Sequence, residues 1–380
     1  MTTTATTGLQ LRSLVTPNGE LEISLQQFDI ADPGADEVVI QVTATPINPS
    51  DLGLLFGMAD LTTAKLSGTT ERPIVTSAIP EAAMKAMQGR VGVSMPVGNE
   101  GAGVVVRAGS SPQAQALLGR TVAMVGGAMY TQFRTAKVAQ CVPLPEGASA
   151  ADGASIFVNP MTALSMTDAM RREGHSALVH TAAASNLGQM LNRICIKDGI
   201  NLVNIVRNAE QEALLRDMGA KYICNSSAPD FVEDVTNKLA ETGATIAFDA
   251  IGGGTLISQI FSCMEVAINR KAKAYSGYGS NTLKQVYVYG ALDTGPTVLK
   301  RNFGFAFALN GWLLTPYLAK IGVEAMQAMQ ARVLAELKTT FASHYSREIS
   351  LAAALQPSEI AIYAQRTTGT KFLINPSLPA

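Results

Sequence analysis

The residues with the most chemical content lie between positions 177 and 227, which read as strand, turn, helix, strand, helix and strand. The turn, residues 181–185, contains only small residues, so a ligand can approach its backbone closely. Gly188 opens a helix whose N-terminal N–H groups and positive dipole end would face an anion beside the turn. In a βαβ unit the usual anion is the pyrophosphate of a dinucleotide. The backbone groups predicted to bind it are those of Ser185, Asn186, Leu187 and Gly188.

The turn departs from a strict G-x-G-x-x-G motif because Ala and Ser replace its first two glycines. The residue at the end of the second strand therefore matters as much as the turn itself. About 20 residues past the turn, NAD sites keep a carboxylate for the ribose 2′-hydroxyl, but this chain has Arg207 there. Arginine offers a planar fork of donors that suits a 2′-phosphate. We therefore expect NADPH, bound by Arg207 with Asn208 as a second candidate; the alternative is a solvated charge beyond a strand end.

Composition limits the classes of function. The chain has 380 residues, 47% hydrophobic and 16% charged, which is enough for two ordered domains with buried cores. The net charge of −1 leaves no basic stripe for phosphates, so nucleic acid is not an expected partner. The N-terminus lacks the features of a signal peptide, and no window is apolar enough for a membrane span. We expect a cytoplasmic protein without membrane contact.

Cysteines and histidines give no sign of a metal site. A zinc site needs three or four nitrogen, sulfur or oxygen ligands. The four cysteines form no CxxC pair, and the three histidines form no set with the spacing of metal ligands. We expect a reduced protein without a metal ion. The residues concerned are Cys141, Cys195, Cys224, Cys263, His175, His180 and His344.

The sequence pattern changes near residue 150. Before it, residues 37–45 and 101–107 alternate apolar and polar side chains, and few such runs are separated by helices, which predicts an antiparallel β-rich domain. After it, strands alternate with helices, which predicts a parallel, doubly wound sheet. A final strand at residues 371–374 suggests that the tail crosses back to the first domain.

The predicted fold is α/β: a Rossmann doubly wound parallel sheet plus a β-rich domain, with the cofactor in a cleft between them. We expect domains at residues 1–155 and 156–340, with a return to the first domain at 341–380. Residues 317–337 are predicted to form one long amphipathic helix. Residues 57–96 and 269–281 are longer than ordinary connections and are interpreted as lids or oligomer contacts.

Several short motifs follow one another in the order in which a known protein family has them. They are INPSD (47–51), VGNEGAGVVVRAG (97–109), LPEGAS (144–149), NPMTALSM (159–166), FDAIGG (248–253), VYGALD (288–293) and TTGTKFLINP (367–376). Over nearly its whole length the chain resembles the zinc-independent medium-chain dehydrogenase/reductase superfamily, in its branch of NADPH:quinone oxidoreductases and 2-enoyl thioester reductases. The resemblance implies a GroES-like fold for the β-rich domain, a homodimer, and a small electrophilic molecule as substrate.

The resemblance also implies roles for individual residues. Asn48 would lie near the nicotinamide ribose and Thr162 would support the nicotinamide end; the alternatives are a turn residue before Pro49 and a helix-start hydroxyl. Tyr130 and Tyr278 are the tyrosines considered as proton donors, whereas Asp51 is expected to be a structural turn or capping residue rather than a base. Further predicted cofactor-binding residues are Asn225 at the adenosine half, Ile251, Gly252, Gly290, Ala291, Phe305 and Lys371.

Three functions remain open from the sequence. The leading hypothesis is a metal-free, NADPH-dependent reductase of quinones or of α,β-unsaturated carbonyl compounds. The second is a 2-enoyl thioester reductase, which the length of the turn favours, although residues 52–61 lack the tyrosine that those enzymes place after NPSD. The third is an NADPH-binding structural protein with little turnover.

Overall fold

The computed structural model describes residues 6–380, which form two compact units. Unit 1 comprises the described residues up to Val158 together with Ala342–Ala380, and unit 2 comprises Asn159–Phe341. Within the described residues, no helix is long and apolar enough to cross a membrane.

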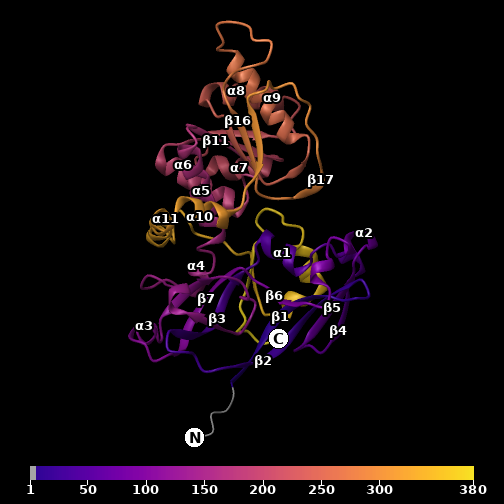
Figure 1. The fold of residues 1–380 in the computed structure, drawn as a ribbon, viewed down its shortest axis with the longest axis vertical. Coiled ribbons are helices and arrows are strands. Elements are labelled where there is room, and N and C mark those ends of the chain that lie inside the picture. Colours follow the sequence, from indigo (N-terminus) through magenta and orange to yellow (C-terminus); the bar gives the residue numbers. More distant parts are fainter. Residues whose placement is uncertain (1–5) are drawn as a thin grey trace. The chain divides into compact units, whose positions relative to one another are not determined.

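Unit 1 is built from two sheets whose strands are almost all antiparallel. The tail contributes to the second sheet, because β20 pairs with β3 (Leu373 with Pro46), and in Figure 1 the yellow terminal segment accordingly runs among the indigo and purple strands. The predicted antiparallel β-rich half is thus confirmed. The first sheet has the order β4 (Lys65–Gly68), β5 (Pro73–Ala78), β2 (Glu20–Ile30), β1 (Thr6–Val15), β6 (Ser94–Pro96). The second has the order β10 (Cys141–Pro143), β8 (Thr121–Val125), β7 (Glu100–Ala108), β3 (Glu37–Pro46), β20 (Phe372–Ile374), β19 (Arg347–Ile349), with β9 (Phe133–Lys137) also on β3.

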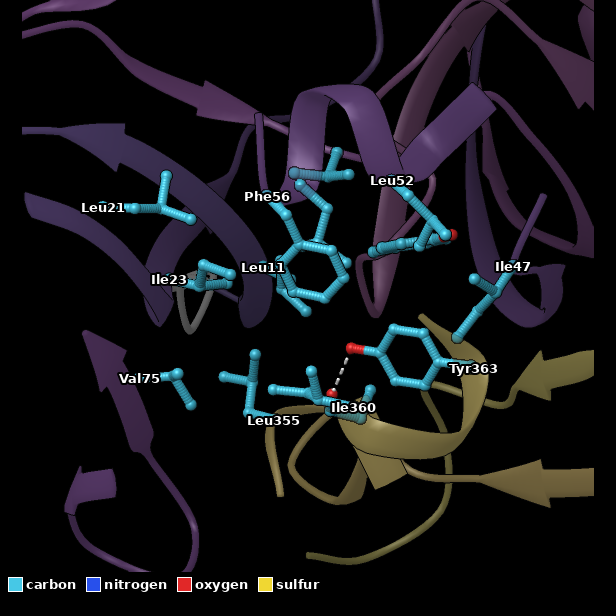
Figure 2. Close-up of a cluster of buried hydrophobic side chains, with 14 of the residues drawn as sticks. Leu11, Leu21, Ile23, Ile47, Leu52, Phe56, Val75, Leu355, Ile360 and Tyr363 are labelled. Atoms are coloured by element: carbon cyan, nitrogen blue, oxygen red, sulfur yellow. Dashed lines mark hydrogen bonds between the residues drawn. The ribbon is translucent and has the colours of Figure 1, made fainter. Parts of the chain in front are cut away.

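The main core of unit 1 joins the beginning of the chain to its end (Figure 2). Leu11 and Ile23 come from the first strands, and Phe56 follows the short helix α1 (Pro49–Leu55). The ring of Phe56 stacks on that of Tyr363, from helix α12 (Pro357–Tyr363), with centroids 5.9 Å apart. The Tyr363 hydroxyl donates a hydrogen bond to the Ala354 carbonyl at 2.8 Å. The remaining short helices of unit 1 are α2 (Glu81–Met84), α3 (Pro112–Gln115) and α4 (Ala150–Gly153).

Unit 2 contains a six-stranded parallel sheet. Every residue of its central strands β11 and β14 is buried, as expected for a parallel sheet covered by helices on both faces. The predicted doubly wound sheet is therefore confirmed. Its order is β13 (Tyr222–Asn225), β12 (Asn201–Val206), β11 (Ala177–Thr181), β14 (Ile246–Asp249), β16 (Lys284–Val288), β18 (Phe307–Gly311). Its helices are α5 (Val158–Arg172), α6 (Asn186–Asp198), α7 (Ala209–Asp217), α8 (Phe231–Thr242), α9 (Leu256–Asn269), α10 (Leu314–Ile321) and α11 (Val323–Ala335); β15 (Gly252–Gly254) pairs with β17 (Asp293–Thr297).

Two segments differ from the sequence-based expectation. The prediction of one helix over residues 317–337 is wrong, because Gly322 takes a left-handed φ of +89° and separates α10 from α11. Apolar residues recur across the break, so periodicity alone could not reveal it. Residues 57–96 supply strands β4, β5 and β6 to the first sheet, and Val75 and Met87 to the core of unit 1.

Candidate functional site

The turn between β11 and α6 brings a helix N-terminus to the carboxyl end of the first strand. Ser185 caps α6 by accepting a hydrogen bond from the Gly188 N–H at 3.1 Å. A side chain at position 188 does not fit, since a Cβ there would lie 2.2 Å from the Ala183 carbonyl oxygen. The helix therefore approaches the turn closely, which is the role that a dinucleotide motif gives to its last glycine. Ala182 holds a left-handed φ of +50° in the same turn.

Arg207 and Asn208 follow β12, where both side chains are exposed. The backbone of Arg207 is fixed on both sides: its N–H donates to the Gln211 side chain at 3.1 Å, and its carbonyl accepts from the Ser227 hydroxyl at 2.8 Å. Asn208 has a structural task as the cap of α7, accepting from the Gln211 N–H at 2.9 Å. Asn225 ends the neighbouring strand β13 opposite Val206, so the predicted adenosine-side residues share one corner of the sheet.

The order of the sheet reverses between β11 and β14, and a buried polar pair lies there. The Thr181 hydroxyl donates to the Asp249 carboxylate at 2.7 Å and accepts from the Ala250 N–H at 2.8 Å. The other oxygen of Asp249 accepts from the Gly252 N–H at 2.7 Å. Burial raises the pKa of Asp249, and these hydrogen bonds oppose the shift. The pair fixes the backbone of Ile251 and Gly252, and neither of its members was predicted from the sequence.

A hollow of about 680 Å³ lies beyond the carboxyl ends of β16 and β18. The predicted residues Gly290 and Ala291 line it, together with Tyr289 and Trp312. Gly290 is needed for a close approach, because a Cβ would lie 2.8 Å from the Ala250 carbonyl oxygen.

Behind Tyr289 lies a buried histidine that the sequence did not single out. The Tyr289 hydroxyl is 2.7 Å from Nε2 of His180. Burial lowers the pKa of His180 to about 3, so its imidazole is neutral at ordinary pH. The pair can therefore exchange a hydrogen bond but holds no charge.

Phe305 and Tyr278 are not brought to this end of the sheet. Phe305 precedes β18, and Tyr278 lies in the loop before β16, so both belong to the amino ends of these strands. They are 74% and 80% exposed and contact each other edge-on. The carboxyl ends of parallel strands form the ligand-binding edge of such a sheet. The geometry therefore does not support Phe305 as a cofactor contact or Tyr278 as a proton donor.

A second polar cluster lies in unit 1, around Lys371. Its ammonium donates to the Asn48 side-chain oxygen at 2.9 Å and to the Ser155 hydroxyl at 3.1 Å. Asn48 is the N-cap of α1, and Lys371 directly precedes β20, so residues more than 300 positions apart meet here. Burial lowers the pKa of Lys371 to about 8, although the carboxylates of Glu100 and Asp51 favour its charged form.

Glu100 organises the other side of this cluster. One of its carboxylate oxygens accepts from the Asn48 amide at 2.9 Å and from the Ser155 hydroxyl at 3.2 Å. The other accepts from the backbone N–H groups of Phe157 and Val158, each at 2.9 Å. The amide of Asn48 is thereby held between a cation and an anion, in one orientation. Sequence reasoning missed Glu100 and Ser155, although Glu100 stands inside the GNEGAG motif.

Asp51 and Tyr130 are buried beside this cluster. Asp51 accepts from the backbone N–H groups of Asn48 and Asn99, both at 2.8 Å, which is the expected capping arrangement. Burial raises the pKa of Asp51 to about 7 against these two hydrogen bonds. Tyr130 is fully buried, donates its hydroxyl to the Pro46 carbonyl at 3.2 Å, and has a pKa raised well above 10, mainly by burial. These features make Tyr130 a poor proton donor.

The last predicted catalytic residue, Thr162, is buried one turn inside α5, which begins at Val158. It is therefore not the hydroxyl that starts the helix. Within residues 6–380, no group of three or more His, Cys, Asp or Glu side chains is placed to hold a metal ion. The four cysteines are free, and burial raises the pKa of all four thiols.

Known proteins match the chain in sequence over part of its length. No family model matches the chain. It is 27% identical over 208 residues to the mitochondrial enoyl-[acyl-carrier-protein] reductase of Xenopus tropicalis, covering 53% of this chain and 51% of that protein. It is 25% identical over 252 residues to a mycocerosic acid synthase-like polyketide synthase of Mycobacterium tuberculosis, covering 66% of this chain and 10% of the synthase. The chain thus spans about half of the first relative and a tenth of the second.

Solved structures match the chain over nearly all of its length. A Mesorhizobium loti protein assigned as an NADPH:quinone reductase has a TM-score of 0.71 and 24% identity, covering 99% of this chain and all of that one. Escherichia coli quinone oxidoreductase complexed with NADPH has a TM-score of 0.68 and 16% identity, covering 98% and 100%. A mutant enoyl thioester reductase of Candida tropicalis reaches 0.67 and 20%, covering 97% and 100%. The predicted α/β fold class is confirmed, and the chain is similar in fold to quinone reductases and an enoyl thioester reductase, as the motifs indicated.

Proposed function

We propose that the protein is an NADPH-dependent oxidoreductase that reduces a quinone or an α,β-unsaturated carbonyl compound without a metal ion. The observation that carries the proposal is the pair formed by the β11–α6 turn and Arg207. The turn lets a pyrophosphate approach a helix N-terminus, and the next strand ends on an exposed guanidinium where NAD sites have a carboxylate. An arginine at this place favours a phosphorylated ribose.

The chain offers groups for each part of the cofactor. Backbone groups at Ser185, Asn186, Leu187 and Gly188 would bind the pyrophosphate, and Arg207 the 2′-phosphate. Asn225 would face the adenosine half, whereas Ile251, Gly252, Gly290 and Ala291 would face the nicotinamide half. NADPH supplies a hydride when it is bound. Asn48 and Thr162 would then position the nicotinamide end, as the motif resemblance implies. We assign residues 156–340 to NADPH binding and residues 1–155 with 341–380 to a GroES-like catalytic domain, and we propose a cytoplasmic homodimer.

The relatives named as enoyl reductases favour a second candidate, reduction of a 2-enoyl thioester. Binding without turnover is the third. A direct test follows NADPH absorbance with a quinone, an enone and an enoyl thioester in parallel, after NADPH binding has been measured by calorimetry. We expect consumption of NADPH with a quinone or an enone. Turnover with the thioester alone supports the second candidate, and tight binding without any turnover supports the third. No uptake of NADPH contradicts all three.

A further inference from the structure

Reduction of a quinone or an enone needs a proton donor as well as a hydride. Tyr345 of unit 1 does not supply one, because burial raises the pKa of its hydroxyl. Tyr130 and Tyr363 of the same unit do not supply one either: Tyr130 donates its hydroxyl to the Pro46 carbonyl, and Tyr363 donates to that of Ala354. Both side chains are buried. The Asp51 carboxyl beside Asn48 is occupied by two backbone N–H groups. The ammonium of Lys371, 2.9 Å from the Asn48 side chain, also carries a transferable proton.

We propose that Lys371 donates the proton to the reduced acceptor, and that Asn48 and Ser155 hold its ammonium in position. The inference rests on the proposed function and deepens it, since Lys371 then acts on the substrate in addition to, or in place of, contacting the cofactor.

The contacts of Lys371 suit a group that must release a proton. Its two hydrogen-bond acceptors, the Asn48 amide oxygen and the Ser155 hydroxyl, are both neutral. A carboxylate in direct contact would stabilise the ammonium and hold its proton more tightly. Here the Glu100 carboxylate lies behind both acceptors, accepting from the Asn48 amide and from the Ser155 hydroxyl. The Glu100 carboxylate therefore balances the charge of the Lys371 ammonium through Asn48 and Ser155 and does not contact it directly.

The ammonium also has a donor to spare. A lysine ammonium carries three N–H donors, and two of them are used. The third has no hydrogen-bond partner among residues 6–380, and the ring of Tyr345 lies 5.9 Å away. Lys371 as a whole residue is half-buried, and the proposal requires that its amine take up a new proton from solvent after each cycle. The titratable groups facing it are Glu100 from β7, Asp51 from α1 and Tyr345.

The proposed reduction needs no reactant other than the hydride of NADPH and the proton of Lys371. Hydride addition to an enone leaves an enolate, and hydride addition to a quinone leaves a hydroquinone anion. One N–H bond of Lys371 breaks, its electron pair stays on Nζ, and the proton forms a C–H or O–H bond on the product. Burial brings the pKa of Lys371 to about 8 against the opposing effect of Glu100 and Asp51, near the value at which a donor is effective in neutral solution.

The activity test uses Lys371→Met, Lys371→Arg and, as a matched control, Lys65→Met, whose side chain is exposed on β4 of the same unit. We expect Lys371→Met to lower kcat by at least about 100-fold, with the Kd for NADPH changed less than about 3-fold. Wild-type kcat should fall above about pH 8, and this limb should be absent in Lys371→Arg. Added ethylamine should restore part of the activity of Lys371→Ala. A loss confined to the KM for NADPH, or none, overturns the proposal.

A second measurement does not depend on turnover. In protein labelled with ¹³C at the lysine ε-carbons, one resonance should titrate near pH 8, below the ordinary lysine pKa of about 10.4, and be missing from Lys371→Met. A Lys371 resonance that titrates near the ordinary lysine value overturns the proton-donor role, whatever the acceptor. A wild-type protein that binds NADPH and reduces no acceptor contradicts the proposed function instead, and the two failures are distinguishable.

Discussion

At the scale of single residues, the proposed cofactor preference depends on Arg207. Arg207 lies at the end of β12 with its backbone fixed by Gln211 and Ser227 and its side chain exposed. The two contacts hold the backbone of Arg207 and do not use the donors of its guanidinium. Asn208, which the sequence offered as a partner, is already engaged as the cap of α7. Under the proposed function, the discrimination between phosphorylated and unphosphorylated cofactor would therefore rest on one side chain.

Arg207→Glu replaces the guanidinium with a carboxylate that repels a 2′-phosphate. A charge-assisted hydrogen bond contributes about 1.5–3 kcal/mol, so we expect the KM for NADPH to rise roughly 10- to 100-fold, with little change for NADH. Steady-state kinetics with both cofactors measure the effect, and Arg301→Glu serves as an exposed control in unit 2. Equal changes for the two cofactors would refute the phosphate assignment.

Asp51 makes stability depend on pH. Its pKa is raised from 3.8 to about 7, chiefly by burial, so the folded protein binds more protons than the unfolded chain between these values. The unfolding free energy therefore decreases as pH rises through this window. Asp51→Asn removes this dependence and adds a pH-independent cost, since one backbone N–H loses its acceptor.

The advantage of the wild type over Asp51→Asn should accordingly shrink by about 2 kcal/mol between pH 5 and 8. Denaturant unfolding at several pH values measures it. Asp36→Asn, at an exposed position, should leave the pH profile unchanged. A constant difference between wild type and Asp51→Asn across this range would contradict the shifted pKa.

At the scale of elements, the β11–α6 turn shows how far small residues can replace glycine. Gly188 is retained where a Cβ would collide with Ala183. At position 182, by contrast, an alanine takes a φ of +50°, which costs an L-residue roughly 1–2 kcal/mol. The turn keeps the shape of a phosphate-binding loop at the expense of local strain.

Ala182→Gly should relieve that strain. Glycine adopts a left-handed φ freely, but it also gains freedom in the unfolded chain, so we expect a net stabilisation of about 0.5–1 kcal/mol. Thermal unfolding of the protein without cofactor is the measurement. Ala183→Gly, at the next residue and with a φ outside the left-handed region, should be destabilising instead. Destabilisation by both variants would show that the turn is not strained at Ala182.

At the scale of the whole molecule, two units with separate cores make up the chain. Unit 2 contains a fully buried ion pair, in which the Lys284 ammonium lies 2.7 Å from the Glu265 carboxylate. Burial alone would raise the pKa of Glu265, but hydrogen bonds from Lys284 and Ser280 outweigh it and lower the pKa to about 2. The pair also anchors the loop before β16, whose Gly279 packs against Gly304 too closely for side chains at either position.

Lys284→Met leaves the Glu265 carboxylate buried without its cation. Breaking a buried pair costs about 3–5 kcal/mol, and we expect the loss in unit 2 alone. Calorimetric unfolding should show one transition lowered and the transition of unit 1 unchanged. Lys273→Met, an exposed change in the loop before β16, should have little effect. If both unfolding transitions shifted by the same amount, the two units would unfold as one.

The sequence by itself determined the order of the helices and strands and the alternation of strand and helix in unit 2. Alternating β and α patterns, the small-residue turn and Arg207 can be recognised from local spacing, because strands, helices and turns are encoded by nearby residues. The sheet in unit 2 and the β-rich unit 1 were predicted on this basis. The break at Gly322 was not, since apolar periodicity continues across a residue whose backbone conformation alone ends the helix.

Only the tertiary structure decided which distant side chains meet. Four separate segments supply Lys371, Asn48, Ser155 and Glu100, whose hydrogen bonds join residues between 52 and 323 positions apart. Thr181 and Asp249 likewise meet because their strands are neighbours in the sheet. Burial, which shifts the pKa of Asp51 and Lys371 toward neutrality, depends on the folded structure. Local sequence carries no information about these long-range contacts, because they exist only after the chain has folded.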